Sequence, residues 1–147
     1  MILSSAAVLA KGTSVLDGTV ISADFHDYHN CETFSDVQFE NCTFRKNLRI
    51  AGSTFTNCVF YNCIFSCDFF DCKFVNCSFA KCEFWQLSMT NILLESSSML
   101  ECDFQYCFLW AVTGGTTMSD CAMFFCKLLC VDTSLENCQL EYVSIDN

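Results

Sequence analysis

Residues 58–84 read CVFYNCIFSCDFFDCKFVNCSFAKCEF, and a Cys-x-Phe unit recurs in them about every five residues. A period of five gives no continuous apolar stripe on an α-helix. Because five is odd, it would also send alternate phenylalanines to opposite faces of a straight strand. An extended Cys-x-Phe segment that is followed by a short corner keeps both side chains pointing inward. Repeating this unit winds the chain into a coil whose turns stack through parallel hydrogen bonds, as in a solenoid.

The units NCVFY, DCKFV and NCSFA resemble those of the pentapeptide-repeat proteins, which carry a large apolar residue at the central position and a small residue two places before it. The resemblance covers roughly Phe34 to Ile145, although this chain uses Cys where Ala is usual and Phe where Leu is usual. It implies an all-β fold, a right-handed quadrilateral parallel β-helix with four repeats in each coil. The chain is then long enough for about five or six coils.

The sequence predicts a single domain with two parts. Residues 1–33 are expected to form an N-terminal cap and irregular leading strands, and residues 34–147 the pentapeptide-repeat β-helix. Residues 1–10, MILSSAAVLA, are apolar, but they are few for a signal peptide and lack its basic start, so we interpret them as a cover for the first coil. No apolar run approaches the roughly 20 residues of a membrane span.

Four breaks in the period mark expected irregularities. We predict a bulged loop near residues 46–53, a corner shortened by one residue between Phe65 and Phe69, a loop or wide turn at Gly114 and Gly115, and a two-residue insertion around residues 130–132.

Wrapping the chain at four repeats per coil gives four interior columns. The predicted columns are Phe39, Phe60, Phe79, Met99, Met118 and Leu140; Phe44, Phe65, Phe84, Phe104, Met123 and Ile145; Phe69, Met89, Leu109 and Leu128; and Phe34, Phe55, Phe74, Leu94 and Leu135, with Gly114 as a hole in the last. Each column is chemically uniform, as a filled coil interior requires.

The 14 cysteines are better explained as thiols packed in the interior than as disulfides or metal ligands. Twelve precede a central residue by two places, where a free Cys serves as a small apolar side chain; Cys31 and Cys130 do not. Some disulfides or a metal site remain alternatives, but bridges between stacked parallel strands would be strained and the spacing differs from that of zinc sites. We predict no metal and no cofactor. Free thiols also favour a reducing compartment, and we expect a cytoplasmic protein.

We find no catalytic motif and predict that the protein is not an enzyme. His26 and His29 lie in a polar leading segment and are expected to be solvated or capping. Paired carboxylates such as Glu101 and Asp103 fall on outward positions, and buried thiols without positive neighbours are inert.

Outward positions between two predicted sides are unusually apolar. We name as the aromatic corner the residues Trp85, Tyr106, Phe108, Trp110, Phe124, Phe125 and Leu129. Exposed aromatic side chains mark interaction surfaces, although a covering segment of the chain itself is the alternative. We therefore predict a non-catalytic protein-binding or scaffold module whose partner is another protein or a second copy of the chain.

The net charge of −10 argues against direct binding of nucleic acid or of an anionic membrane. Arg45, Lys46 and Arg49 form the only basic cluster and are interpreted as a solvated loop. The alternative function is implied by the resemblance, because some family members are acidic mimics of DNA that bind DNA gyrase and confer quinolone resistance. An acidic column along one side would favour mimicry, but the carboxylates of this sequence are scattered, and no helical pattern suited to dimerisation follows the last repeats.

Overall fold

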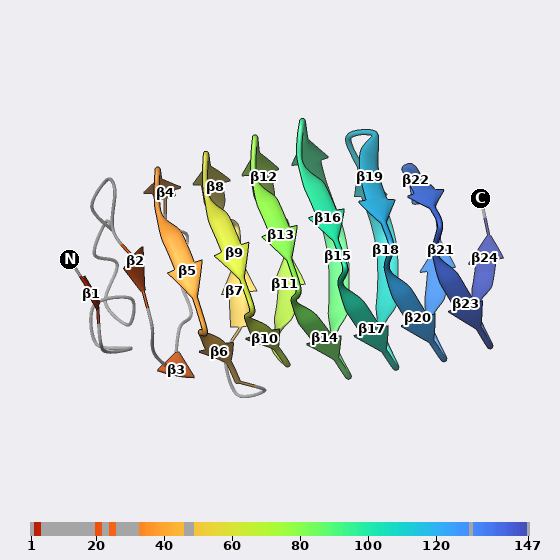
Figure 1. Cartoon of the computed structure of the whole chain (residues 1–147). Helices are drawn as coiled ribbons and strands as arrows, with labels where there is room; N and C mark the ends of the chain where they lie inside the picture. The colour runs from red at the N-terminus through yellow and green to blue at the C-terminus, as the bar shows by residue number, and fades with distance from the viewer. Residues whose placement is uncertain are drawn as a thin grey trace.

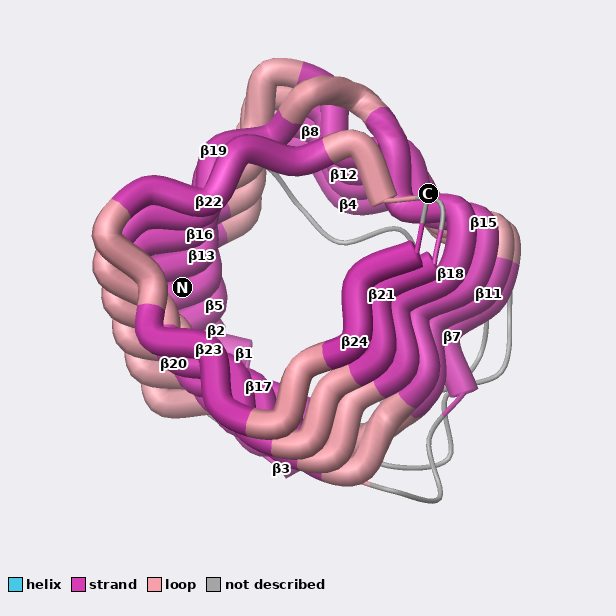
Figure 2. Tube along the Cα trace, turned by 90° about the vertical axis from the view of Figure 1, so that its right-hand side faces the viewer, coloured by secondary structure: helices cyan, strands magenta, loops and turns pink. Residues whose placement is uncertain are grey.

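Each five-residue unit forms a short strand that ends in a sharp corner, and successive strands turn around a common axis. In this computed structural model the strands stack into a parallel β-solenoid of about six turns (Figure 1). The structure describes residues 2–3, 20–21, 24–25, 33–45, 49–129 and 131–146. Viewed along the axis, the coils enclose a common interior (Figure 2). The predicted all-β pentapeptide-repeat solenoid is confirmed.

The coil has four sides, which we number in the order in which the chain visits them. Side 1 contains β1 (Ile2–Leu3), β2 (Val20–Ile21), β5 (Gln38–Glu40), β9 (Val59–Tyr61), β13 (Ser78–Ala80), β16 (Ser98–Leu100), β19 (Thr116–Ser119) and β22 (Thr133–Glu136). Side 2 contains β3 (Asp24–Phe25), β6 (Thr43–Phe44), β10 (Ile64–Phe65), β14 (Glu83–Trp85), β17 (Asp103–Gln105), β20 (Ala122–Phe124) and β23 (Gln139–Glu141).

Sides 3 and 4 share two bent strands, β15 (Ser88–Glu95) and β18 (Phe108–Thr113). Side 3 contains β7 (Arg49–Ala51), β11 (Asp68–Phe70), the first halves of β15 and β18, β21 (Lys127–Leu129) and β24 (Ser144–Asp146). Side 4 contains β4 (Thr33–Ser35), β8 (Thr54–Thr56), β12 (Lys73–Val75) and the second halves of β15 and β18.

The corners depend on left-handed backbone. Seventeen non-glycine residues of the described ranges have φ between 50° and 56°, and nine of them are Asn or Asp, the residue types that tolerate this conformation best. Several Asn side chains also form ladders between coils, as when Asn76 Nδ2 donates to Asn57 Oδ1 at 2.8 Å and Asn57 Nδ2 donates to Asp36 Oδ1 at 3.0 Å. The corner between Phe65 and Phe69 has no residue with positive φ, which agrees with the predicted loss of one residue there.

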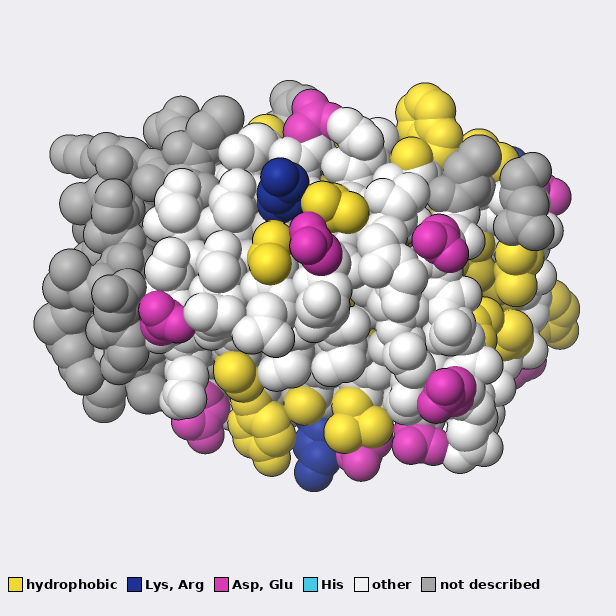
Figure 3. All heavy atoms as spheres, turned by 90° about the horizontal axis from the view of Figure 1, so that it is seen from above, with side chains coloured by type: hydrophobic (Ala, Val, Ile, Leu, Met, Phe, Trp, Pro, Cys, Tyr) yellow, Lys and Arg dark blue, Asp and Glu magenta, His cyan; other side chains and the backbone are white. Residues whose placement is uncertain are grey.

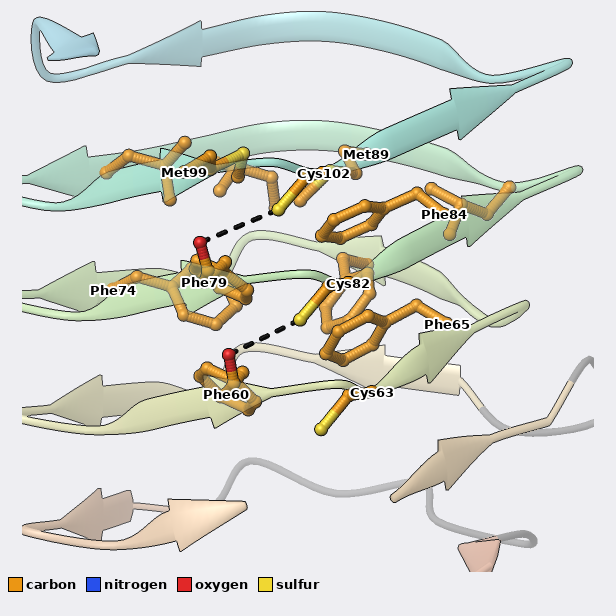
Figure 4. Packing of buried hydrophobic residues seen from close by; sticks show 14 of the residues in the cluster. Phe60, Cys63, Phe65, Phe74, Phe79, Cys82, Phe84, Met89, Met99 and Cys102 are labelled. Atoms are coloured by element: carbon orange, nitrogen blue, oxygen red, sulfur yellow. Dashed lines mark hydrogen bonds between the residues drawn. The ribbon is translucent and has the colours of Figure 1, made fainter. Parts of the chain in front are cut away.

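Stacked phenylalanines fill the interior, and the cysteines line it beside them. Phe84 lies between Phe65 and Phe104, with ring centroids 4.9 Å and 4.5 Å away. Ten of the twelve described thiols donate a hydrogen bond to a backbone carbonyl of the preceding coil; Cys82 Sγ donates to that of Phe60 at 3.3 Å and Cys102 Sγ to that of Phe79 at 3.5 Å (Figure 4). The thiol thus satisfies its donor without leaving the apolar column.

The structure corrects the predicted interior in two places. Residues 49–51, assigned to a bulged loop, form strand β7, and Ile50 pairs with Phe69 and is buried; residues 46–48 lie outside the described ranges. The last coil is also shifted by one side, because Leu135 pairs with Met118, Leu140 with Met123 and Ile145 with Leu128.

The cause of the shift is a shortened fourth side. Leu128 and Leu135 are seven residues apart, whereas the corresponding residues of an earlier coil, Met89 and Met99, are ten apart. The break around residues 130–132 is therefore a pair of repeats that lacks three residues. The prediction of a single repeat with two inserted residues is wrong. Only a short link crosses side 4 here, where the amide of Asp132 donates to the carbonyl of Val112 at 2.8 Å.

The first strands lie further toward the N-terminus than Phe34. β2 pairs with β5 and β3 pairs with β6, so the sheets of sides 1 and 2 extend into the region that was assigned to leading strands. β1 pairs with β2 and belongs to the same sheet as side 1, and the other residues of the predicted cap lie outside the described ranges, as do His26 and His29.

Candidate protein-binding surface

Three aromatic residues occupy successive corners between side 2 and side 3. We name Tyr106, Phe125 and Tyr142 the aromatic ladder. The corner hydrogen bonds set their positions, because the amide of Tyr106 donates to the carbonyl of Phe124 at 2.9 Å and the amide of Phe125 to that of Glu141 at 3.0 Å. Each residue therefore lies directly over the corresponding residue of the coil before it.

The rings of the aromatic ladder stack on one another. Tyr106 and Phe125 have centroids 5.5 Å apart with 3° between their planes, and Phe125 and Tyr142 have centroids 4.6 Å apart with 9° between theirs. Phe124, the last residue of β20, packs against all three rings edge-on at centroid distances of 5.9, 4.5 and 6.0 Å. The ladder is nevertheless about half exposed, with fractional exposures of 50% for Tyr106, 46% for Phe125 and 68% for Tyr142.

The backbone of the aromatic ladder is strained. The φ angles of Tyr106, Phe125 and Tyr142 are 56°, 50° and 54°, in the left-handed region that bulky residues avoid at a cost of roughly 1–2 kcal/mol each. Nine other corners of the described ranges use Asn or Asp instead. Strained backbone that persists in a folded protein clusters at active sites, ligand clamps and switch regions.

The structure brings together only part of the predicted aromatic corner. Tyr106, Phe124 and Phe125 are in contact, and Phe108 follows the same corner as the first residue of β18. Trp85 belongs to the same outward row as Phe124, with Gln105 between them. Trp110 and its neighbour Leu129 lie at the far end of side 3. The seven residues thus cover two adjacent sides, rather than one corner.

The predicted aromatic corner does not include Tyr142. Its place over Phe125 becomes visible only when the last coil is wrapped with a shortened fourth side. The sequence contains one signal for it: in each of the three units the aromatic residue stands two places after the central residue, as Tyr106 does after Phe104, Phe125 after Met123 and Tyr142 after Leu140.

The carboxylates do not form a continuous acidic column on the face over sides 4 and 1, opposite the aromatic ladder. On the face shown in Figure 3, Asp and Glu side chains are scattered among neutral ones, and hydrophobic side chains gather toward the C-terminal end. On side 2, Glu83 and Asp103 are direct partners on neighbouring strands, beside Trp85. The exposed indole and the two carboxylates therefore share one patch of the solenoid wall.

Most of the thiols are poorly suited to nucleophilic chemistry, although hydrogen bonds with the thiols of Cys107 and Cys58 lower the pKa of Cys126 and of Cys77, respectively. The twelve described cysteines are all free, and eleven of them are buried. A hydrogen bond with the Cys42 thiol, together with burial, raises the pKa of Cys63 to about 12, and burial raises the pKa of Cys72 to about 11. Within the described ranges, no group of three or more His, Cys, Asp or Glu side chains is placed to hold a metal ion.

Among the residues that the structure describes, none belongs to a helix with the length and apolar character needed to cross a bilayer.

Comparisons with known proteins give no match to a family model and no match to a curated protein sequence. One similar solved structure is QnrB1, a plasmid-mediated fluoroquinolone resistance protein, with 13% identity and a TM-score of 0.34 over 100% of this chain and 84% of that one. A second is the pentapeptide repeat protein Rfr23 from the cyanobacterium Cyanothece 51142, with 11% identity and a TM-score of 0.38 over 70% of this chain and 67% of that one. A third is HetL, a pentapeptide repeat protein involved in heterocyst differentiation regulation from the cyanobacterium Nostoc sp. strain PCC 7120, with 10% identity and a TM-score of 0.27 over 98% of this chain and 86% of that one. Scores this low add no weight of their own. The assignment rests on the recurring five-residue unit, the inward pair of side chains and the four-sided parallel coil, and by these features the chain is a pentapeptide-repeat β-helix.

Proposed function

We propose that the chain is a non-catalytic protein-binding scaffold that presents the aromatic ladder and the adjoining apolar residues of sides 2 and 3 to a partner protein. The observation that carries this proposal is the combination of strain and exposure at Tyr106, Phe125 and Tyr142. Asn at these corners would relieve the backbone, so the interior of the solenoid gives no reason for aromatic residues there. A partner protein that buries the rings would give a reason for aromatic residues at these corners.

Aromatic side chains are suited to this role because they supply a large contact area at a low cost in conformational entropy. The stacked ladder also reduces that cost, since each ring is already held by its neighbours. The rigid coil behind the ladder fixes the spacing of the rings before the partner arrives.

The experiment that tests this proposal places a photo-crosslinking amino acid at Phe125 in cells that express the chain natively. We expect a discrete crosslinked species, whose mass distinguishes a second copy of the chain from a different protein. The matched control places the same amino acid at Tyr61, which is exposed to 41% on side 1, away from the ladder. Equal crosslinking at the two positions, or none at Phe125, would contradict the proposal.

A second candidate is the acidic DNA mimic that modulates a topoisomerase, and the net charge of −10 favours it. The scattered carboxylates in Figure 3 and the exposed aromatic ladder between sides 2 and 3 favour the scaffold instead. A gyrase supercoiling assay with the purified chain separates the two functions, because only the mimic inhibits or protects the enzyme.

A further inference from the structure

Residues of β14 and β17 on side 2 line a hollow of about 390 Å³: the outward residues Glu83, Trp85, Asp103 and Gln105, together with Phe84 between two of them. The register places Glu83 opposite Asp103 and Trp85 opposite Gln105. Because residues i and i+2 of a strand point to the same face, the two carboxylates lie at one end of the hollow, and the indole and the amide lie at the other.

Within the described residues, the negative charge of the hollow has no cationic counterpart. Like charges directly opposite one another on neighbouring strands destabilise a sheet. Among the described residues no cationic group lies within ion-pair distance of Glu83 or Asp103, and Lys81, which borders a neighbouring hollow with Glu83, pairs with Glu101 at 4.0 Å. Asp103 Oδ2 accepts a hydrogen bond from Gln105 Nε2 at 3.1 Å, which satisfies one oxygen without supplying charge.

The indole of Trp85 is available to a ligand. It is 48% exposed, and it has no ring partner in the part of the chain that the structure describes. A cation that enters the hollow would therefore meet the electron-rich face of an indole and two carboxylates together. A guanidinium group suits this combination better than an ammonium group, because it is planar, stacks on aromatic rings and donates several hydrogen bonds in one plane.

We propose that this hollow receives an arginine side chain of the partner protein. The inference rests on the proposed function, because the hollow adjoins the aromatic ladder: Gln105 directly precedes Tyr106 and separates Trp85 from Phe124 in the same outward row. A partner seated on the ladder thus reaches the hollow without leaving the surface. The net charge of −10 attracts such a basic partner over a longer range.

The test uses the purified chain and N-acetyl-arginine methylamide as the probe, followed by NMR of the indole N–H signals. The chain has two tryptophans, so the Trp85 signal reports on the hollow and the Trp110 signal is an internal control. We expect a saturable shift of the Trp85 signal alone. The citrulline analogue, which has nearly the same shape but no charge, should give no saturable shift, and the lysine analogue should bind more weakly than arginine.

Two variants make the test specific. Glu83→Gln combined with Asp103→Asn removes both charges, at one exposed and one partly buried position, and should weaken arginine binding about tenfold or more, since a charge-assisted hydrogen bond is roughly twice as strong as a neutral one. Glu95→Gln, an exposed carboxylate of side 4, should leave binding unchanged. An equal response to citrulline, equal shifts of both indole signals, or full binding by the double variant would overturn the inference.

The two proposals fail separately. If arginine does not bind while crosslinking at Phe125 persists, the partner exists and the hollow is not its arginine site. If arginine binds at Trp85 but Phe125 captures nothing, the hollow is a cation site and the proposed partner surface is wrong.

Discussion

Phe125 lies on Tyr142 with ring centroids 4.6 Å apart and 9° between the ring planes, although both residues hold a left-handed backbone that their side chains disfavour. Stacking and strain therefore oppose each other at the same two residues. An aromatic pair contributes roughly 0.5–1.5 kcal/mol beyond its buried area, which is similar to the cost of one left-handed bulky residue. The aromatic ladder thus adds little to the stability of the fold.

This balance predicts the effect of Phe125→Asn on stability. Asn loses the stacking on Tyr106 and Tyr142 but relieves the backbone, so the free energy of unfolding should change by no more than about 1 kcal/mol. Phe125→Val loses the stacking and keeps the strain, because a β-branched residue is especially unfavourable at positive φ, and it should cost about 2 kcal/mol or more. Urea unfolding of both variants checks this prediction, which is wrong if Asn destabilises as much as Val.

The two adjacent glycines should respond differently to alanine. A Cβ at Gly114, where φ is 113°, would lie 2.4 Å from the backbone oxygen of Leu94, and the backbone cannot move away without breaking the coil. A Cβ at Gly115, where φ is 68°, meets nothing within 4 Å. We expect Gly115→Ala to cost about 1 kcal/mol from its backbone alone and Gly114→Ala clearly more. Thermal unfolding of the pair measures the difference, and equal melting temperatures would contradict the close approach.

The thiol columns predict a loss of stability in alkaline solution. The pKa of Cys63 is raised from 9.0 to about 12 and that of Cys72 to about 11, so these thiols keep their protons in the folded state at pH values where the unfolded chain loses them. The unfolded state then binds fewer protons, and the free energy of unfolding falls between about pH 9 and pH 12, by up to roughly 1.4 kcal/mol per pH unit for each thiol.

Denaturant unfolding under reducing conditions at pH 7, 8, 9 and 10 tests this dependence. The free energy of unfolding should show no contribution from these thiols at the two lower pH values and should decline at the two higher ones. The variant Cys63→Ala with Cys72→Ala is the control, and it should decline less steeply. If the two proteins have the same slope above pH 9, the raised pKa values do not govern alkaline stability.

Trp110 offers a test of how far the binding surface extends. Its indole is 47% exposed at the far end of side 3, so Trp110→Asp should change the free energy of unfolding by only about 0.5 kcal/mol. If the partner covers both sides, this variant should reduce crosslinking from Phe125 about tenfold or more, because Asp buries a charge in an apolar contact. Undiminished crosslinking would confine the contact to the aromatic ladder and its immediate neighbours.

The sequence predicts the interior wherever a cysteine and a phenylalanine mark each unit. From Phe55 to Leu109 the predicted columns agree with the observed strand pairing, because only one way of winding keeps both side chains inside. Ile50 was not recognised, since no small residue of the repeat precedes it in an obvious unit. The last coil was misplaced because seven residues between Leu128 and Leu135 can be counted as one repeat with an insertion or as two with a deletion, and only the pairing decides.

The surface was less predictable than the interior. The aromatic residues can be recognised in the sequence because they occupy outward positions that solvent should make polar, but the sequence does not separate the ladder from Trp110 and Leu129. Corner residues differ from strand residues in backbone conformation. The side chains of Tyr106 and Phe125 do not indicate a positive φ, because aromatic residues rarely adopt one. The carboxylate pair at Glu83 and Asp103 became visible only when β14 and β17 were aligned.

The parallel stacking of the coils also fixes the spacing of residues along the surface. Each coil advances the chain by one strand spacing of about 4.8 Å, so the distance between two residues of one row is fixed by the number of coils that separate them. Inserting one complete coil between β17 and β20 would move Tyr106 and Phe125 apart by that increment and leave the rest of the wall unchanged. A partner that contacts successive residues of the aromatic ladder would then meet a gap of known size. A series of variants with one, two or more inserted coils would measure, in units of one coil, how closely the partner's own contacts are spaced.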